Sequence, residues 1–99
     1  MVEIIWTEPA LNDLNDVIEY IALQNVKAAK KLTQTIFSKI ERLAFFPHSG
    51  KVPEELTMLN FKEVVVPPCR IFYRVAEDKV YILHVMRQER DLARFLLSH

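Results

Sequence analysis

The apolar residues of this 99-residue chain change their spacing near its middle, and that change limits the folds it can adopt. Between residues 8 and 44 they recur at intervals of three and four, which is the period of an α-helix. Between residues 61 and 86 they alternate with polar residues, as in a half-buried β-strand. Helices followed by strands predict an α+β fold, an antiparallel sheet with helices packed on one face.

The first half of the chain predicts one short strand and two helices. "VEIIW" (2–6) is rich in β-branched and aromatic residues, and Thr7 follows it as a candidate N-cap for a helix that runs to about Gln24. Asn25 can cap a second helix almost at once, so the two helices are expected to fold back as an αα-hairpin. The apolar stripes they would bury are Leu11, Leu14, Ile18 and Ile21 in the first helix, and Ala29, Leu32, Ile36, Ile40 and Leu43 in the second.

The second half predicts three strands and a final helix. A turn-rich loop, "FFPHSGKVPEEL" (45–56), separates them from the helices. The final helix would bury Leu92, Phe95 and Leu96. The strands are expected at 61–66, 69–75 and 79–86 and the helix at about 89–97, which gives the order β-α-α-β-β-β-α in a single domain, 1–99.

A two-residue turn at Glu77 and Asp78 would pair Val75 with Val80, Tyr73 with Ile82 and Ile71 with His84. One face would then carry Ile71, Tyr73, Val75, Val80, Ile82, His84 and Met86, and the other Arg70, Phe72, Arg74, Tyr81, Leu83, Val85 and Arg87. The first face is free of fixed charge and is expected to hold the helices. The second would be an uncovered apolar surface with arginines, which is typical of a protein-binding site. Alternatively, the arginines only solvate the sheet and lie over its aromatic rings.

Charge is unevenly distributed although the formal net charge is zero. Residues 1–24 carry five acidic and no basic residues, whereas residues 25–99 carry thirteen basic and eight acidic ones. Nucleic-acid-binding proteins usually have an overall basic excess, so this distribution favours a complementary protein partner and no direct sequence-specific nucleic-acid binding. No apolar run is long enough to span a bilayer, and the lone Cys69 excludes a disulfide framework, so a cytoplasmic protein is expected.

Catalytic candidates are few. Cleavage of a phosphodiester needs a base, cations for the developing charge, and a proton donor. Arginines are available, but His84 is expected in the core, His48 lies in the long loop, and His99 ends the sequence. The three histidines and the one cysteine are not spaced like metal ligands. The pair Ser49-Gly50 follows no strand, so it does not form a nucleophile elbow, and Glu54-Glu55 fits a solvated loop. Neither a cofactor nor a metal is therefore expected.

Three motifs resemble the ParE/RelE superfamily of toxins from bacterial type II toxin–antitoxin modules. They are "FP-x-SG" (46–50), "PP-x-RI-x-YRV" (67–75) and "V-x-I-L-x-V-x-R-x-x-RD" (80–91). The ending is most similar to the ParE branch, which implies a non-catalytic toxin that binds DNA gyrase and is neutralised by a ParD-like antitoxin. Arg87 stands where many ParE relatives have His, and the lysine cluster of the RelE branch is missing, although the ending Ser98-His99 is similar to that of some ribonuclease members.

The resemblance leaves three hypotheses. The first is a ParE-type gyrase inhibitor in a hetero-oligomer with its antitoxin, the second a RelE-like ribosome-dependent mRNA endonuclease, and the third a relic that only binds antitoxin. Under the first hypothesis there is no catalytic residue, and the target and the antitoxin bind the second face and the C-terminal segment. The residues expected to form that site are Arg70, Phe72, Arg74, Tyr81, Leu83, Arg87, Arg90, Asp91 and Arg94.

Overall fold

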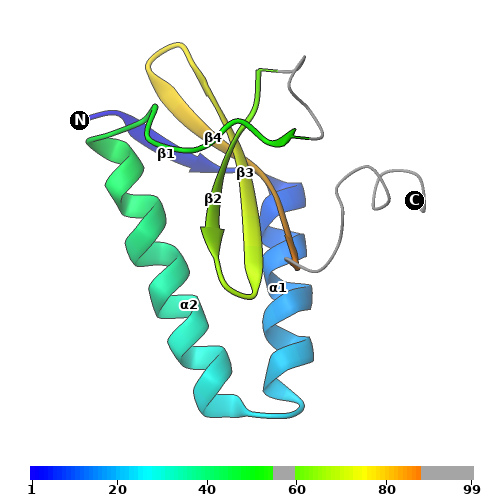
Figure 1. Ribbon diagram of the computed structural model, residues 1–99. Coiled ribbons are helices and arrows are strands. Elements are labelled where there is room, and N and C mark those ends of the chain that lie inside the picture. Colours follow the sequence, from blue (N-terminus) through cyan, green and yellow to red (C-terminus); the bar gives the residue numbers. More distant parts are fainter. Residues whose placement is uncertain (55–59, 88–99) are drawn as a thin grey trace.

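A four-stranded sheet packs against a helical hairpin in the structure, a computed structural model that describes residues 1–54 and 60–87 (Figure 1). The predicted helix at 89–97 lies outside these residues. In the described part of the chain no helix is long and apolar enough to cross a membrane. The elements are β1 (Glu3–Trp6), α1 (Glu8–Ala22), α2 (Val26–Glu41), the 3-10 helix η1 (Arg42–Ala44), β2 (Lys62–Val66), β3 (Cys69–Ala76) and β4 (Lys79–Arg87).

Both helices begin at the predicted caps. The Thr7 hydroxyl accepts a hydrogen bond from the backbone N–H of Ala10, and the Asn25 side chain accepts one from Ala28 at 3.0 Å. These bonds satisfy backbone donors that the first turn of a helix leaves without partners. The Thr7 hydroxyl also donates to the carbonyl oxygen of Ile82 at 2.6 Å, so the same residue that begins α1 ties it to the middle of β4.

The sheet has the order β1-β4-β3-β2. Its three later strands form consecutive antiparallel hairpins, as predicted. The prediction that the whole sheet is antiparallel was wrong, because β1 pairs with β4 in parallel and the sheet is mixed. Parallel pairing needs a long connection between the two strands, and here both helices and the β2–β3 hairpin lie between them in the chain.

A β-bulge interrupts the β3–β4 hairpin. Near the turn the register is the predicted one, with Tyr73 opposite Ile82, and Glu77 and Asp78 both have positive φ, as a tight two-residue turn requires. Leu83 is then skipped, so Phe72 faces His84. An extra residue in one strand reverses its alternation from that point on. The predicted pairing of Ile71 with His84 was therefore wrong.

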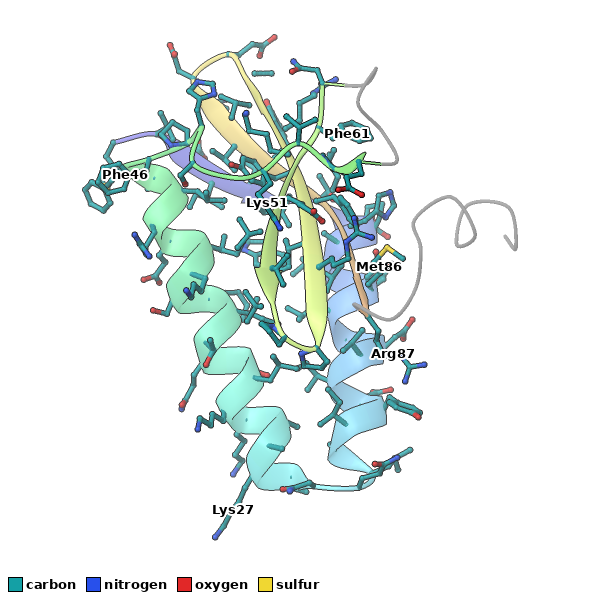
Figure 2. The ribbon with its side chains drawn as sticks, in the orientation of Figure 1. Lys27, Phe46, Lys51, Phe61, Met86 and Arg87 are labelled. Atoms are coloured by element: carbon teal, nitrogen blue, oxygen red, sulfur yellow. The ribbon has the colours of Figure 1, made fainter. Side chains whose placement is uncertain are left out.

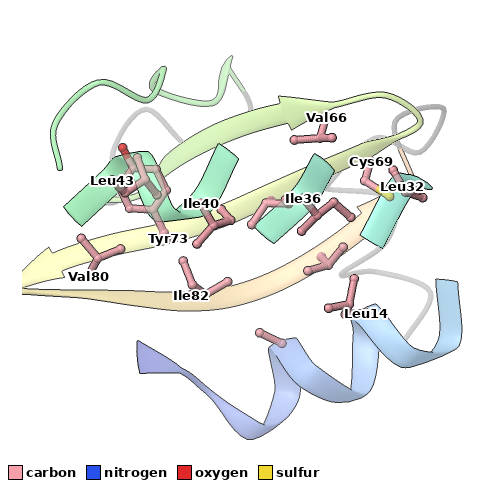
Figure 3. Packing of buried hydrophobic residues seen from close by; sticks show 13 residues of the cluster. Leu14, Leu32, Ile36, Ile40, Leu43, Val66, Cys69, Tyr73, Val80 and Ile82 are labelled. Atoms are coloured by element: carbon pink, nitrogen blue, oxygen red, sulfur yellow. The ribbon is translucent and has the colours of Figure 1, made fainter. Parts of the chain in front are cut away.

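The bulge exchanges the two faces over the second half of β4. Val85 lies opposite Ile71 and joins the buried cluster under the helices, whereas His84 and Met86 belong to the opposite face. We call that opposite face the second face; its residues in β2, β3 and β4 are Glu63, Val65, Arg70, Phe72, Arg74, Ala76, Lys79, Tyr81, His84 and Met86. Figure 3 shows the covered face, where Leu14 from α1 and Ile36 and Ile40 from α2 point toward the sheet.

The loop after η1 is fixed to the sheet by Tyr73 and Lys51. The Tyr73 hydroxyl donates to the carbonyl oxygen of Pro47 at 2.9 Å and accepts from the backbone N–H of Gly50 at 2.8 Å. Lys51 exchanges two backbone hydrogen bonds with Glu63 on the outer edge of β2. A Cβ on Gly50 would lie 2.5 Å from the Tyr73 oxygen, so glycine is required here by space. The "FP-x-SG" and "YRV" motifs therefore contact each other.

Candidate protein-binding site

The second face is less open than the sequence predicts. Arg74 is exposed, in agreement with the expectation, but Phe72 is only 2% and Met86 only 3% exposed. Val85, which alternation placed here, lies instead in the core because of the bulge. What remains accessible on β3 and β4 is a polar and aromatic strip rather than a broad apolar patch.

Arg70 is held in a buried cluster at the β2 side of the second face. Its Nε donates to Glu63 Oε2 at 2.8 Å, and the two side chains are 11% and 9% exposed. The guanidinium also lies over the Phe72 ring, 5.0 Å from its centroid. Glu63 faces Phe72 across the β2–β3 pair, so the carboxylate and the ring hold the arginine between them. The guanidinium of Arg70 is thus paired with a carboxylate within the fold.

Arg74 and Tyr81 form the accessible part of the strip. They lie directly opposite each other in the β3–β4 register, and Tyr81 is also the partner of Ile5 in β1. Arg74 is exposed and makes no ion pair with another described residue, while Tyr81 is half-buried. An exposed guanidinium beside a tyrosine is a typical centre of a protein–protein contact.

Arg87 lies on the helix side of the sheet, so its predicted place on the second face was wrong. It is opposite Cys69, a core residue, and its guanidinium lies 4.5 Å from the centroid of the Tyr20 ring in α1. Figure 2 shows Arg87 at the end of β4, beside the middle of α1. The bulge at Leu83 is the cause, because strict alternation would have left Arg87 on the side of Arg70.

Asp13 and His84 form a contact that the sequence did not reveal. His84 was expected in the core, and that expectation was wrong. One oxygen of Asp13, Oδ2, lies 3.1 Å from His84 Nδ1 and accepts a hydrogen bond from the backbone N–H of Val85 at 3.1 Å. Beyond Ile82 the strand β4 has no β1 partner, so this carboxylate satisfies a donor on a free edge. The side chain of His84 is 45% exposed.

The predicted site residues are therefore distributed over three environments. Arg70, Phe72, Arg74 and Tyr81 share the second face, Arg87 lies on the other side, and half-buried Leu83 occupies the bulge without a register partner. The remaining predicted residues, Arg90, Asp91 and Arg94, lie outside the described residues. Within the described residues no group of three or more His, Cys, Asp or Glu side chains is arranged to hold a metal ion.

Comparison with known families agrees with this architecture. The family described as "ParE toxin of type II toxin-antitoxin system, parDE" matches residues 4–92. The chain belongs to this ParE toxin family. The match extends over both helices and all four strands, so the second face and the Asp13–His84 contact fall inside it. The resemblance to the ParE/RelE superfamily seen in the three motifs is confirmed.

Proteins with RelE names and with ParE names are similar to this ParE family member. Toxin RelE2 of Caulobacter vibrioides (strain ATCC 19089 / CIP 103742 / CB 15) is 32% identical over 91 residues, which cover 91% of this chain and 99% of that protein. A chain of the chromosomal ParDE toxin–antitoxin system from P. aeruginosa has a TM-score of 0.76 at 22% identity and covers 90% of this chain and 98% of its own. A chain of the RelBE2 toxin–antitoxin complex from Mycobacterium tuberculosis has a TM-score of 0.57 at 17% identity, with coverages of 87% and 96%. The two structures establish the common fold.

Proposed function

We propose that this toxin acts by binding DNA gyrase through the second face and the C-terminal segment, without catalysing a reaction. The observation that carries the proposal is that Arg70 is buried and ion-paired. A guanidinium that is buried and paired with Glu63 is poorly placed to stabilise charge on a substrate phosphate. Arg74 and Tyr81 remain accessible, and an arginine beside an aromatic ring suits a protein partner.

We further propose that a ParD-like antitoxin neutralises the toxin by forming a hetero-oligomer with it. The two structural neighbours come from toxin–antitoxin systems, which supports a partner of this kind. The zero net charge is also consistent with a protein partner, because proteins that bind nucleic acid along its backbone generally carry a basic excess.

A supercoiling assay with purified gyrase tests the proposal. Wild-type toxin should abolish supercoiling. Arg74→Glu should raise the toxin concentration needed for inhibition by at least about tenfold, because it puts a negative charge where the toxin is expected to present a cation to its partner. Lys39→Glu, on α2, is the matched charge-reversal control and should leave inhibition unchanged. Undiminished gyrase activity at a large molar excess of folded toxin would contradict the proposal.

A second candidate, ribosome-dependent mRNA cleavage, is favoured by the Asp13–His84 contact. A carboxylate that holds Nδ1 of a histidine leaves Nε2 to exchange a proton, an arrangement that general-base catalysts use. His84 also lies on the same face as Arg70. This candidate predicts cut transcripts in the presence of ribosomes, a loss of at least about 100-fold in His84→Ala, and a loss of at least about tenfold in Arg70→Ala.

The wild-type toxin and the same variants distinguish the two candidate functions when both assays are run on them. Under gyrase inhibition, His84→Ala retains inhibition in the supercoiling assay and transcripts stay intact with every variant. Under mRNA cleavage, wild-type toxin leaves gyrase active and cuts transcripts. Thermal unfolding of each variant is the control that the loss of an effect does not reflect loss of the fold.

A further inference from the structure

The outer edge of β1 carries backbone groups that the sheet does not use. β1 stands at one end of the strand order, so only one of its two edges pairs with β4. The N–H of Thr7 donates to the carbonyl oxygen of Ile82 at 3.1 Å, and because the bonds on one edge of a strand recur at every second residue, Ile5 also bonds to β4. The N–H and C=O groups of Ile4 and Trp6 therefore point outward. They form no hydrogen bond with any residue that the structure describes.

The other edges of the sheet are partly closed by the fold itself. On β2, Glu63 exchanges two backbone hydrogen bonds with Lys51, and beyond Ile82 the Val85 N–H of β4 donates to Asp13. Edge strands are usually protected by a charge or a proline in the segment that could pair with another chain. The two β1 residues with outward backbone groups are β-branched and aromatic, so they offer no such protection. Backbone groups in this position bond to water or to another strand.

Exposed apolar side chains lie next to this edge. The N–H of Val2 donates to the carbonyl oxygen of Ala44 at 2.8 Å, which brings the end of η1 against the beginning of β1. Phe45 and Phe46 follow η1 directly and are 66% and 60% exposed, and Met1 is exposed as well. Figure 2 shows Phe46 at this end of the molecule. Apolar side chains exposed together are typical of a surface that another protein covers.

We infer that β1 pairs with β1 of a second copy of this chain, antiparallel and about a two-fold axis beside Ile5. In this register Ile4 of one copy lies opposite Trp6 of the other, and each of these two pairs exchanges both of its backbone hydrogen bonds. All the outward groups of the two residues are then satisfied. Ile5 lies opposite Ile5 and Glu3 opposite Thr7, so no like charges face each other across the axis.

A second copy matches this edge better than a nucleic acid or an unrelated strand does. The cross-strand neighbours are an isoleucine with a tryptophan and two isoleucines, and apolar pairs of this kind stabilise a sheet. The formal net charge of zero removes the long-range repulsion that keeps charged proteins apart. A nucleic acid would meet no cation near β1, because residues 1–24 contain no Lys or Arg. The paired segment also lacks a charge that would select one particular foreign strand.

The pairing joins two sheets edge to edge. An axis of this kind is perpendicular to the sheet, so the second faces of both copies lie on the same side of it. The dimer would therefore present two strips formed by Arg74 and Tyr81 to a target. This consequence rests on the proposed function, whereas the pairing of β1 does not.

Sedimentation velocity of the purified full chain should show a monomer–dimer equilibrium. Ile5→Lys and Ile5→Glu each place like charges across the axis and should raise the Kd of the dimer at least about tenfold. An equimolar mixture of the two variants should dimerise again, because unlike charges then face each other, and this recovery shows that both variants fold. Val65→Lys is the matched control, since Val65 is a half-buried residue of the second face on the other edge strand, and it should dimerise like wild type.

A disulfide tests the position of the axis directly. In an antiparallel pair that exchanges no hydrogen bonds, the opposite Cα atoms lie about 4.5 Å apart, which is within the range of a disulfide. Ile5→Cys should therefore form a covalent dimer under mild oxidation, detected on a non-reducing gel, and Val65→Cys should not. Cys69 is buried and is present in both proteins, so it does not distinguish them.

Three outcomes would overturn the inference. The wild-type chain stays monomeric at about 1 mM, or Ile5→Cys forms a disulfide no faster than Val65→Cys. A dimer that Ile5→Lys leaves intact would place the interface elsewhere. A monomeric chain that binds an unrelated extended peptide, with amide chemical-shift changes at Ile4 and Trp6, would make the occupant a strand of another protein. None of these measurements involves gyrase, so a failure of the proposed function leaves their results unchanged.

Discussion

Replacing Gly50 by alanine tests how the loop and the sheet are joined. A Cβ at this position would lie 2.5 Å from the Tyr73 hydroxyl oxygen, 2.7 Å from Cε1 of the same ring and 2.8 Å from the backbone oxygen of Glu63. The ring is almost fully buried and the Glu63 oxygen belongs to a strand, so neither can move freely. The loop must therefore shift, and with it the hydrogen bond from Gly50 to Tyr73.

The size of the effect follows from two contributions. Overpacking a well-filled interior costs about 1–3 kcal/mol. Loss of the Gly50–Tyr73 hydrogen bond adds about 0.5–1.5 kcal/mol. Together the two contributions predict that Gly50→Ala lowers the free energy of unfolding by about 1.5–4.5 kcal/mol, which corresponds to a fall of about 6–36 °C in Tm for a domain of this size.

Urea unfolding followed by circular dichroism measures this change. Ser49→Ala, one residue earlier and exposed, is the control and should stay within about 0.5 kcal/mol of wild type. In a Tyr73→Phe background the nearest of the three contacts is absent, so Gly50→Ala should cost at least about 1 kcal/mol less there. A loss below about 0.5 kcal/mol for Gly50→Ala, or an equal loss in both backgrounds, would refute the steric argument.

Three further predictions concern the same architecture. Burial raises the pKa of the Tyr73 hydroxyl, and the hydrogen bond from the Gly50 N–H lowers it by less. The stability that the protonated hydroxyl contributes is therefore present below the ordinary tyrosine pKa of 10.0 and should be lost as pH rises through the higher pKa of the folded state. In thermal melts, Tyr73→Phe should reduce this loss of stability at alkaline pH. Glu63→Ala removes the carboxylate that accepts from the buried Arg70 Nε, and urea unfolding should show a loss of about 3–5 kcal/mol, whereas a loss under about 1 kcal/mol would mean that solvent reaches the pair. Asp13→Ala removes the acceptor of the Val85 amide and should cost about 1–3 kcal/mol, with faster hydrogen exchange at that amide; unchanged exchange would argue against the contact.

The local sequence determined the parts of this fold that depend on neighbouring residues. Thr7 and Asn25 begin the helices because their side chains accept hydrogen bonds from the next turn, and the stripe from Leu32 to Ile40 is buried because helical spacing puts those residues on one side. The tight turn at Glu77 was likewise predictable, and with it the register of the first hairpin pairs.

Only the tertiary structure decided where the functional candidates lie. The bulge at Leu83 adds one residue to a strand, and it moves Arg87 to the helices and His84 away from them. The ion pair that occupies Arg70 and the carboxylate that reaches His84 join residues distant in the chain. Sequence periodicity predicts the face of the strand on which a side chain lies. Its interaction partner is determined by long-range packing, and that partner determines whether the charge of the side chain is available for binding or catalysis.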